Sequence, residues 1–401
     1  MPWNEVDVQE QRIRFAVLAE RGEHTMAELC REFGISRQAG YKWRQRYREE
    51  GVAGLAERSR RPHGSPEKTP EPIEQRVVEQ REKRPDWGAR KLQVKLAEEG
   101  VKLPVITIHR ILLRRGLVAA EDRIRPALRR FERAEPNELW QMDFKGMPRV
   151  WQTAGLTPLS ILDDHSRYLL ALRAQQHTKG KPVRETLEEV FTRCGMPRQM
   201  LLDHGTPWWN MQGAGWTRLS VWLMQQGVEL RFSGYRHPQT QGKVERMHGS
   251  LQRALERRGR PRRREDWQCW LDGFREEYNH ARPHEALGMA TPESRWRAST
   301  RRFDTEPKRW EYPAGSWVRR VGVNGGLWLG GKRWEISRAL SNQDVALEQV
   351  GDRILVRYCE TTVRELDLKT GRSTSPAVNL RDFVWPDPSD EDEDWGPVDA
   401  G

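Results

Sequence analysis

The sequence has few cysteines and lacks long apolar runs. Its cysteines are scattered and form no Cys-x-x-Cys pair, so we expect neither a zinc knuckle nor a disulfide framework. No run of about 18 apolar residues is present, which argues against a membrane span. Residues 1–7 lack a basic stretch followed by an apolar one, so secretion is not expected. Scattered thiols are typical of a reducing cytoplasm, and we expect core roles for Cys30, Cys194, Cys269 and Cys359.

Two chemical signatures are also missing. No Gly-x-x-x-x-Gly-Lys-Ser/Thr sequence is present, so nothing indicates use of a nucleoside triphosphate. His-x-x-Glu spacing is absent from the second half, and of His237, His248, His280 and His284 only the last two have His-x-x-x-His spacing, so we do not expect these histidines to form a zinc site.

Positive charge is what the chain has in excess. The 401 residues include 69 Lys and Arg against 58 Asp and Glu, which gives a net charge of +11. This balance favours a polyanionic partner, either nucleic acid or an anionic surface. The length predicts two to four domains at roughly 150 residues each.

Residues 9–50 have the pattern of a helix-turn-helix domain. Thr25 and Glu28 have the spacing of a capping box at the start of a second helix, and residues 34–36 predict a short turn. The third helix, 37–47, has a polar and basic N-terminal face suited to a major groove. The alternative is an ordinary three-helix bundle with a solvated basic face. On the first interpretation, the DNA-binding residues are Arg37, Gln38, Tyr41, Lys42 and Arg44.

Residues 51–70 are rich in Gly, Pro and Arg and predict a basic linker. Residues 71–120 predict a second helix-turn-helix-like domain with helices at 73–83, 89–98 and 105–114; a helical spacer is the alternative. Residues 123–135 are charged and predict a further linker.

From residue 136 to 298 the pattern changes to strands followed by alternating helices and strands, which predicts an α/β sheet domain. Short strands between turn residues at 310–372 predict a small β-barrel. Residues 385–401 are acidic and Pro-rich, and we expect them to be disordered. In the α/β domain we expect strands at 139–144, 156–163, 168–173, 200–202 and 228–232, and helices at 181–194, 215–227 and 242–257.

Three carboxylates occupy unusual positions. Asp143 and Asp203 end apolar, strand-like runs, and Glu245 opens a basic helix. Oxygen ligands from three elements are what a pair of divalent cations needs for phosphodiester chemistry. For each residue alone there is an ordinary explanation, such as stabilisation of a helix N-terminus by Glu245.

Five sequence motifs accompany these carboxylates: Trp140-Gln-Met-Asp143-Phe, Leu162-Asp-Asp-His-Ser-Arg167, Asp203-His-Gly205, Pro238-Gln-Thr-Gln-Gly-Lys-Val-Glu-Arg246 and Tyr278-Asn-His-Ala-Arg-Pro-His284. Together they resemble the insertion-sequence transposases of the DDE type, which have a retroviral-integrase-like catalytic core. The resemblance covers residues 10–300 and implies an RNase H-like fold, two Mg²⁺ ions that Mn²⁺ can replace, and strand transfer on DNA ends by a dimer or larger assembly. It also implies a bacterial, nucleoid-associated protein, and by position it makes Asp143, Asp203 and Glu245 the catalytic and metal-binding triad.

Two positions depart from the family's pattern. His204 stands where the family usually has Asn, and we expect it to keep a polar contact near the metal ions. Gln252 stands where the family commonly has Lys or Arg, so contact with the transposon end is expected to pass to Arg253. Lys243 and Arg246 are further predicted phosphate contacts.

Several alternatives stay open at this point. Asp163 and Asp164 resemble a metal pair, but a turn-stabilising role is favoured, and Arg282 and His284 are expected to pack beneath the catalytic helix. The basic run 257–264 is either a solvated loop or a DNA-tracking patch. For the whole chain, the competing hypotheses are a catalytically inactive DNA-binding regulator and a plain nuclease of RNase H type.

Overall fold

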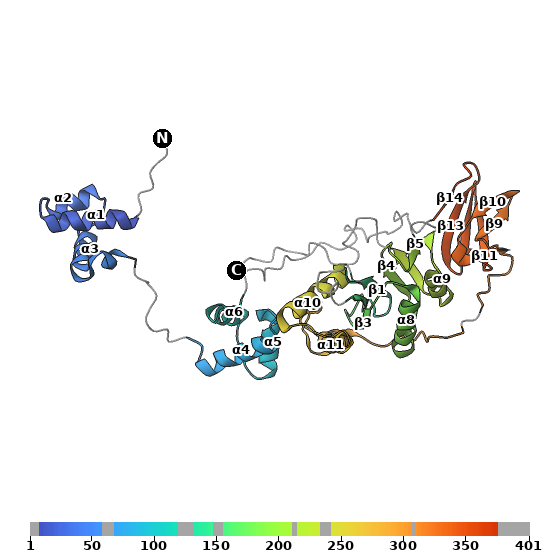
Figure 1. Ribbon diagram of the computed structural model, residues 1–401, viewed down its shortest axis with the longest axis horizontal. Coiled ribbons are helices and arrows are strands. Elements are labelled where there is room, and N and C mark those ends of the chain that lie inside the picture. The colour runs from blue at the N-terminus through green and yellow to red at the C-terminus, as the bar shows by residue number, and fades with distance from the viewer. Residues whose placement is uncertain are drawn as a thin grey trace. The chain divides into compact units, whose positions relative to one another are not determined.

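The computed structural model describes residues 8–57, 68–118, 132–146, 155–210, 215–232, 242–306 and 309–375. The chain divides into two compact units, residues 1–69 and 70–401 (Figure 1). None of the helices in these described ranges has both the length and the apolar character that crossing a membrane requires.

The first unit is a three-helix domain. It contains α1 (Val8–Arg21), α2 (Met26–Glu32) and α3 (Arg37–Glu50). The predicted capping box is present, because the Thr25 hydroxyl accepts from the Glu28 backbone while the Glu28 carboxylate accepts from the Thr25 backbone. Ser36 caps α3 in turn, after a turn in which Gly34 has a φ of 64°. The predicted helix–turn–helix order is therefore confirmed.

Close packing between α2 and α3 depends on a glycine. Gly40 is buried, and a Cβ added there would lie 2.5 Å from Cys30 Sγ. The core between the three helices consists of Phe15, Ala19, Leu29 and Cys30.

The predicted linker at 51–70 is wrong at its start. Residues Gly51–Leu55 form the 3-10 helix η1, and the Leu55 side chain is fully buried. Burial of the Leu55 side chain stabilises this short helix by more than the glycines around it destabilise it. The basic residues 58–62 lie outside the described residues.

The second unit begins with a smaller helical part. It contains α4 (Glu71–Lys83), α5 (Ala89–Glu98) and α6 (Val105–Arg114), as the sequence predicts. Its core is Val77, Trp87, Leu92, Leu96, Ile108, Ile111 and Leu112.

A five-stranded mixed sheet forms the centre of the second unit, in the order β3-β2-β1-β4-β7. The first three strands are antiparallel neighbours, whereas β1, β4 and β7 are parallel. Parallel neighbours need crossover helices, and these follow β3 and β4 in the chain. The strands are β1 (Leu139–Phe144), β2 (Thr157–Asp163), β3 (Leu169–Gln175), β4 (Gln199–Leu202) and β7 (Glu229–Phe232).

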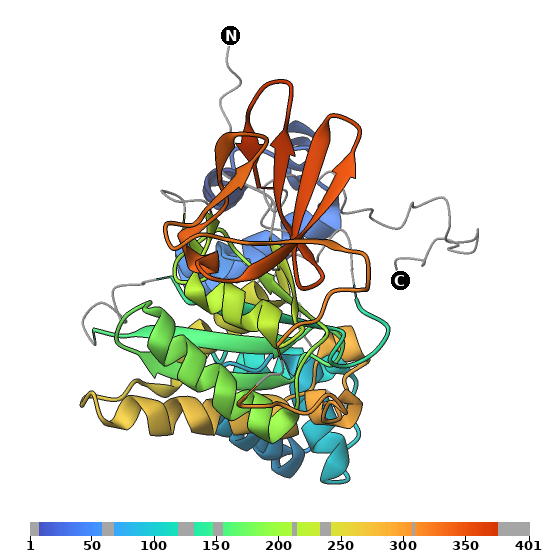
Figure 2. The ribbon, with the colours of Figure 1, turned by 90° about the vertical axis from the view of Figure 1, so that its right-hand side faces the viewer.

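Helices cover both faces of this sheet (Figure 2). Side chains of α8 (Gly180–Cys194) and α9 (Arg218–Gln225) share one core with Trp140, Met142 and Ile161. Side chains of α10 (Gly242–Arg258) and α11 (Asp266–Glu276) share the other core with Leu162 and Leu169. The chain then continues through the π-helix η4 (Glu277–Ala281) and the 3-10 helices η5 (Glu285–Leu287) and η6 (Pro292–Arg295).

The helix predicted at 215–227 begins later than expected. Gly215–Trp216 is instead the short strand β6, which pairs with β5 (Trp209–Asn210). Thr217 and Ser220 then form a capping box that starts α9. Because Trp216 pairs with Trp209, residues 215–216 form a strand instead of the first turn of the predicted helix.

The C-terminal strands form an open sheet rather than the predicted closed barrel. The sheet order is β14-β13-β12-β11-β8, beside a separate β9–β10 hairpin. No ladder joins β14 to β8 within the described residues, and closure requires such a pairing. The predicted tail at 385–401 lies outside the described residues. The elements are β8 (Trp317–Arg320), β9 (Gly326–Leu329), β10 (Lys332–Glu335), η7 (Arg338–Leu340), β11 (Asp344–Val350), β12 (Arg353–Tyr358), β13 (Thr361–Asp367) and β14 (Ser373–Thr374).

This C-terminal sheet shares the core of the central sheet. Val345, Val356 and Leu366 belong to the same buried cluster as the side chains of α8 and α9. The Trp216 indole N–H also donates to the Val363 carbonyl at 2.9 Å.

An ion-pair cluster joins the smaller helical part to the central domain. Asp86, between α4 and α5, accepts from Arg282 at 2.7 Å and from Arg258, in the last turn of α10, at 2.7 Å. Burial alone would raise the Asp86 pKa, but the two guanidinium groups hold it below its usual value. Arg282 thus packs at the end of α10, whereas His284 approaches the Tyr278 carbonyl at 3.4 Å.

Candidate functional site

The sheet order brings two of the three predicted carboxylates to one edge. Asp143 lies near the end of β1, opposite Ser160 of β2, and Asp203 directly follows β4. Because β1 and β4 are parallel neighbours, their carboxyl ends meet at the same edge. Glu245 lies in the first turn of α10, which packs against β1 and β2.

Negative charge accumulates around Asp143. Burial, followed by the charges of Asp203 and Glu245, raises the Asp143 pKa to about 7, although the Phe144 backbone N–H and Lys145 oppose this. The pKa of Glu245 is also raised, mainly by burial. A divalent cation would offset this excess charge, so the donor set fits a hard metal ion.

The three carboxylates do not form a preassembled cage. Among the residues that the structure describes, no group of three or more His, Cys, Asp or Glu side chains is arranged to hold a metal ion. Asp143, Asp203 and Glu245 thus interact through their charges without yet converging on one point.

His248 is a neighbour of Asp143 that sequence reasoning did not assign to the site. Its Nδ1 lies 3.9 Å from Asp143 Oδ2, and its Nε2 lies 2.9 Å from Ser160 Oγ. Burial, followed by the charge of Lys145, lowers the His248 pKa to about 3, so the ring is neutral. The only signal in the sequence is its position one helical turn after Glu245.

Asp203 is held by its own turn. Its Oδ1 accepts from the Gly205 backbone N–H at 3.0 Å and from the Trp208 indole N–H at 2.6 Å. The ring of His204 packs instead against Trp209 and Phe232, at centroid distances of 5.5 and 5.4 Å. The expected polar contact of His204 is not found among the described residues, where its Nε2 is buried without a hydrogen bond.

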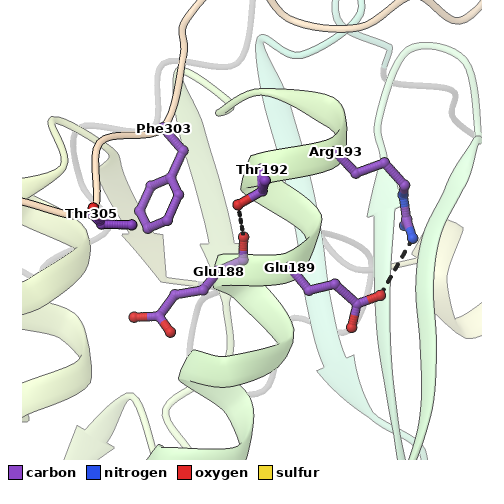
Figure 3. A pocket seen from close by; sticks show the side chains of 6 residues that line it. All are labelled: Glu188, Glu189, Thr192, Arg193, Phe303 and Thr305. Atoms are coloured by element: carbon purple, nitrogen blue, oxygen red, sulfur yellow. Dashed lines mark hydrogen bonds and ion pairs between the residues drawn. The ribbon is translucent and has the colours of Figure 1, made fainter.

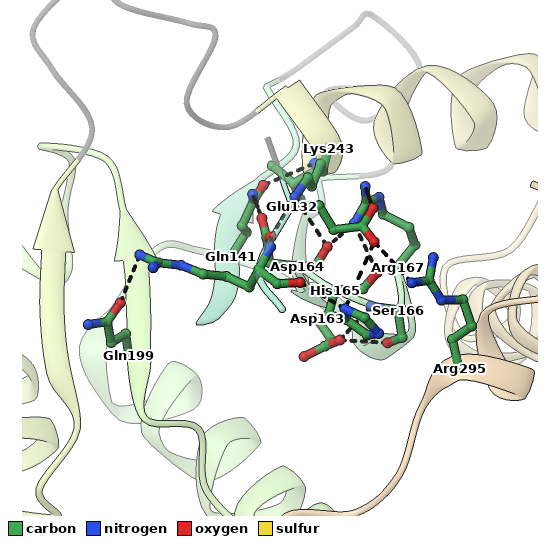
Figure 4. Close-up of polar contacts among 12 residues, drawn as sticks. Glu132, Gln141, Asp163, Asp164, His165, Ser166, Arg167, Gln199, Lys243 and Arg295 are labelled. Carbon is green, nitrogen blue, oxygen red and sulfur yellow. Dashed lines mark hydrogen bonds and ion pairs between the residues drawn. The ribbon is translucent and has the colours of Figure 1, made fainter. Parts of the chain in front are cut away.

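The predicted turn role of the two neighbouring aspartates fits their contacts (Figure 4). Asp163 accepts from the Ser166 backbone at 2.8 Å and from the Asn137 backbone at 2.7 Å. Asp164 is fully buried and pairs with Lys243 at 2.5 Å. Both carboxylates are thus engaged by the fold.

The Asp164 contact changes the interpretation of Lys243. Its ammonium is mostly buried, and burial lowers its pKa to about 8. Gln141 donates to Asp164 at 2.8 Å and accepts from the Val244 backbone N–H at 3.3 Å. Lys243 and Gln141 therefore attach the first turn of α10 to β1 and to the Asp164 turn, and Lys243 is not available as a free phosphate contact.

The other predicted contacts on α10 differ in exposure. Arg246 is exposed, whereas Arg253 is half-buried and donates to Ser250 at 3.3 Å. Gln252 donates to Glu256 at 2.8 Å. In the run 257–264, Arg257 donates to the Pro85 carbonyl and Arg258 binds Asp86, so the start of the run is part of the domain contact and not a solvated loop.

The predicted DNA-facing residues of α3 are exposed with one exception. Arg37, Gln38, Tyr41 and Lys42 face solvent within the first unit. Arg44 is half-buried and binds Glu20 at 2.9 Å, so it contributes to the contact between α1 and α3.

The second unit also has an open depression beside α8 (Figure 3). Glu188, Glu189, Thr192 and Arg193 line it together with Phe303 and Thr305. None of the predicted site residues belongs to its lining, so it is separate from the carboxylates.

Four family descriptions match segments of the chain. A Helix-turn-helix domain matches residues 11–63, and a Homeodomain-like domain matches residues 39–112. An Integrase core domain matches residues 133–238, and a second model of that description matches residues 226–292. Together with the sheet order, these matches identify the central domain as an integrase catalytic core of RNase H-like fold.

Two curated proteins are similar over part of the chain. The insertion element IS407 uncharacterized 31.7 kDa protein of Burkholderia multivorans is 23% identical over 240 residues, which is 57% of this chain and 81% of that protein. The Gag-Pol polyprotein of baboon endogenous virus is 27% identical over 131 residues, or 32% of this chain and 7% of the polyprotein.

Similar solved structures include two of retroviral origin. The HTLV-2 integrase catalytic core domain, solved with magnesium in trimeric form, has a TM-score of 0.31 and 12% identity, covering 40% of this chain and 97% of that one. The simian T-cell lymphotropic virus intasome in complex with PP2A regulatory subunit B56 gamma has a TM-score of 0.35 and 13% identity, covering 71% and 94%.

The helix-turn-helix and integrase core domains indicate a protein that binds DNA. Their combination in one chain, with a relative encoded by an insertion element, agrees with the motifs of the sequence. The chain is a helix-turn-helix protein with an integrase core domain, as expected of an insertion-sequence transposase of the DDE type.

Proposed function

We propose that the protein is a transposase that binds the ends of an insertion element, cleaves DNA there and joins those ends to a target. The observation that carries the proposal is the accumulation of negative charge at Asp143, whose pKa is raised to about 7 next to Asp203 and Glu245 at one edge of an integrase core sheet. Such a cluster is suited to phosphodiester chemistry that depends on a divalent cation.

Asp143, Asp203 and Glu245 would hold the metal, which we take to be two Mg²⁺ ions that Mn²⁺ can replace. Bound ions would make an attacking water or 3′-hydroxyl more acidic and stabilise the oxygen that leaves phosphorus. In the joining step, a new bond forms between the 3′-oxygen and phosphorus while the target strand's P–O bond breaks. No nucleoside triphosphate is consumed.

The protein's own groups would keep the site in order. Gln141 and Lys243 attach the first turn of α10, which carries Glu245, to β1 and to the Asp164 turn. His248 stays neutral next to Asp143, so it adds no positive charge that would compete with a metal ion.

Cleavage and joining can be tested with the terminal sequences of the element that encodes the protein. Labelled ends, a target plasmid and Mg²⁺ would be incubated with the wild-type protein and with Asp203→Asn. Loss of one metal-ligand charge should reduce joined product by roughly 1000-fold, because metal coordination stabilises the transition state by several kcal/mol.

Glu256→Gln is the matched control, since Glu256 is an exposed carboxylate on the same helix as Glu245. Equal joining by wild type and Asp203→Asn would contradict the proposal. Specific binding without cleavage by the wild type would favour the inactive regulator, and cleavage without joining would favour a nuclease.

The DNA-binding part of the proposal rests on the exposed face of α3. Gln38 and Lys42 would contact a base edge and a phosphate, respectively, together with Arg37 and Tyr41. Lys42→Ala should weaken binding to specific and random DNA alike and lower the slope of log K against log salt by about 1. Gln38→Ala should instead reduce discrimination between the two sequences, by about 1 kcal/mol or more.

Gln45→Ala is the control for these variants, because Gln45 is exposed on the same helix and bonds to Glu49 at 2.9 Å. Fluorescence anisotropy at several salt concentrations measures all four proteins. Wild-type affinity and salt slope in both Gln38→Ala and Lys42→Ala would rule out this face of α3.

Arg246 and Arg253 of α10 are proposed to contact the cleaved end. Because two ends must act together, we also propose a dimer or a larger assembly, located in the cytoplasm.

A further inference from the structure

One buried side chain connects the two aspartates of the candidate site. Trp208 is 1% exposed, and its indole N–H donates to Asp203 Oδ1 at 2.6 Å and to the Asp203 carbonyl at 3.0 Å. Its ring stacks on Phe144, with centroids 5.4 Å apart and planes 11° apart. Phe144 directly follows Asp143 at the end of β1. Trp208 thus contacts Asp203 on one side and the neighbour of Asp143 on the other.

The contacts of Asp203 divide its two carboxylate oxygens. In the described part of the chain, the hydrogen bonds to the carboxylate come from Trp208 and from the Gly205 backbone, and both go to Oδ1. A hydrogen bond to a carboxylate fixes the rotation of the group and is stronger than one between neutral partners. Oδ2 is therefore the oxygen that is left to accept a cation.

The space around the carboxylate also limits its rotation. A Cβ added at Gly205 would lie 3.0 Å from both Asp203 oxygens, so the backbone of the turn is close against the group. Together with the indole N–H, this contact leaves little freedom for the side chain.

We propose that Trp208 is a positioning residue that fixes the Asp203 carboxylate, with Oδ1 held by the protein and Oδ2 presented to a divalent cation. The stack on Phe144 fixes Asp203 relative to β1 and so to Asp143. The proposal rests on the metal-dependent function proposed above. It assigns Trp208 no contact with DNA or with the reacting atoms.

Trp208→Phe is the variant that tests this role, because phenylalanine keeps an aromatic ring on Phe144 and removes only the N–H donor and part of the ring. Mn²⁺ binding to the full-length protein without DNA would be measured by isothermal titration calorimetry. Loss of a group that orients a metal ligand should raise the Mn²⁺ dissociation constant by about 10- to 100-fold. In the joining assay, the Mn²⁺ concentration for half-maximal rate should rise by a similar factor, while the rate at saturating Mn²⁺ changes less.

Trp209→Phe is the matched control. Trp209 is the adjacent tryptophan, and its ring centroid lies 4.8 Å from that of Phe232 and 5.4 Å from that of Trp216. Among the described residues, the donors to the Asp203 carboxylate are Trp208 and the Gly205 backbone, and not Trp209. This variant should bind Mn²⁺ within about twofold of the wild type, as expected for a change that affects packing alone.

A second measurement applies if Trp208→Phe does not fold. Gly205→Ala leaves the indole in place but adds a methyl group against both Asp203 oxygens, so it should also weaken Mn²⁺ binding. Wild-type Mn²⁺ affinity in Trp208→Phe would overturn the role of Trp208. If Gly205→Ala is the only folded variant, wild-type affinity in it would show that the orientation of the Asp203 carboxylate does not govern metal binding, which overturns the proposal as well. If the wild type itself binds no Mn²⁺ while Asp203→Asn behaves identically, the proposed function fails and this inference fails with it.

Discussion

Asp86 is buried and Asp143 is half-buried, but their surroundings shift their pKa values in opposite directions. Burial raises the Asp143 pKa to about 7, and the nearby charges of Asp203 and Glu245 add to the effect. At Asp86, Arg282 and Arg258 overcome burial and hold the pKa below its usual value. Asp86 therefore has its counter-charges within the protein, whereas Asp143 requires a proton or a cation from outside.

A half-buried neutral histidine, His284, predicts how stability depends on pH. Burial, with the charges of Arg282 and Lys91, lowers the pKa of His284 to about 3, against an unfolded value of about 6.5. Between these values the unfolded state binds more protons, so the contribution of His284 to stability is present above pH 6.5 and is lost as pH falls. The free energy of unfolding should fall between pH 7.5 and 4.5 in the wild type. In His284→Gln, which lacks this titrating ring, that fall should be smaller than in the wild type by up to roughly 2 kcal/mol.

Urea denaturation at a series of pH values measures this difference. The control is His177→Gln, since His177 is exposed and its replacement should leave the pH profile unchanged. An identical pH dependence of wild type and His284→Gln would show that His284 is not buried as a neutral ring.

The sequence singles out the three carboxylates as a predicted site but gives no sign of the residues that surround them. Asp143, Asp203 and Glu245 stand out because each is locally unusual. A turn brings Trp208 to Asp203, and the packing of α10 brings His248 to Asp143. Neither contact has a sequence pattern of its own. Contacts of this kind become visible only when the register of β1 against β2 and β4 is known.

At the level of elements, local signals were reliable where their partners are close in sequence. The capping box of Thr25 and Glu28 starts α2 as predicted, and the three helices of residues 71–114 have nearly the predicted ends. Prediction failed where pairing with another segment determines the secondary structure. Trp216 was predicted to be helical, but it lies in a strand that pairs with Trp209. The open edge of the C-terminal sheet is a second case, because short strands alone do not determine whether a sheet closes.

The attachment of the small helical part to α10 gives a prediction at this scale. In Asp86→Asn the two guanidinium groups of Arg258 and Arg282 lose their shared buried counter-charge. Breaking a buried pair in this way should cost about 3 kcal/mol, at the lower end of the usual range because Arg258 keeps Glu277 as a partner at 2.8 Å.

Denaturant unfolding of the full chain measures the cost. Asp352→Asn is a suitable comparison, since Asp352 pairs with Lys369 at the surface, where such pairs contribute at most about 1 kcal/mol. Equal losses in the two variants would mean that the Asp86 cluster does not hold the two parts together.

For the whole molecule, the division into two compact units predicts two separate unfolding transitions. Gly40→Ala should affect only the transition of the first unit, because its methyl group would be forced against Cys30 in the first unit's core. Overpacking of this kind costs about 1–3 kcal/mol, which for a unit of this size lowers the midpoint by roughly 4–8 °C per kcal/mol.

Differential scanning calorimetry resolves the two transitions. Gly273→Ala makes the same chemical change in the second unit, on α11, where nothing lies within 4 Å of the added carbon. It should leave the first transition unchanged. A shift of both transitions by Gly40→Ala would mean that the units do not unfold independently.

The bond between Trp216 and Val363 has a consequence for the protein's synthesis. The two residues are 147 positions apart, and they join the central and C-terminal sheets in one buried cluster. At a translation speed of about 5–20 residues per second, Trp216 leaves the ribosome roughly 7–30 s before its partner does. During that interval, the apolar side chains of α9 that share a core with the C-terminal sheet lack the partners that bury them in the folded protein. A chain that stops before residue 317 never gains that cover, so truncated products should aggregate or be degraded.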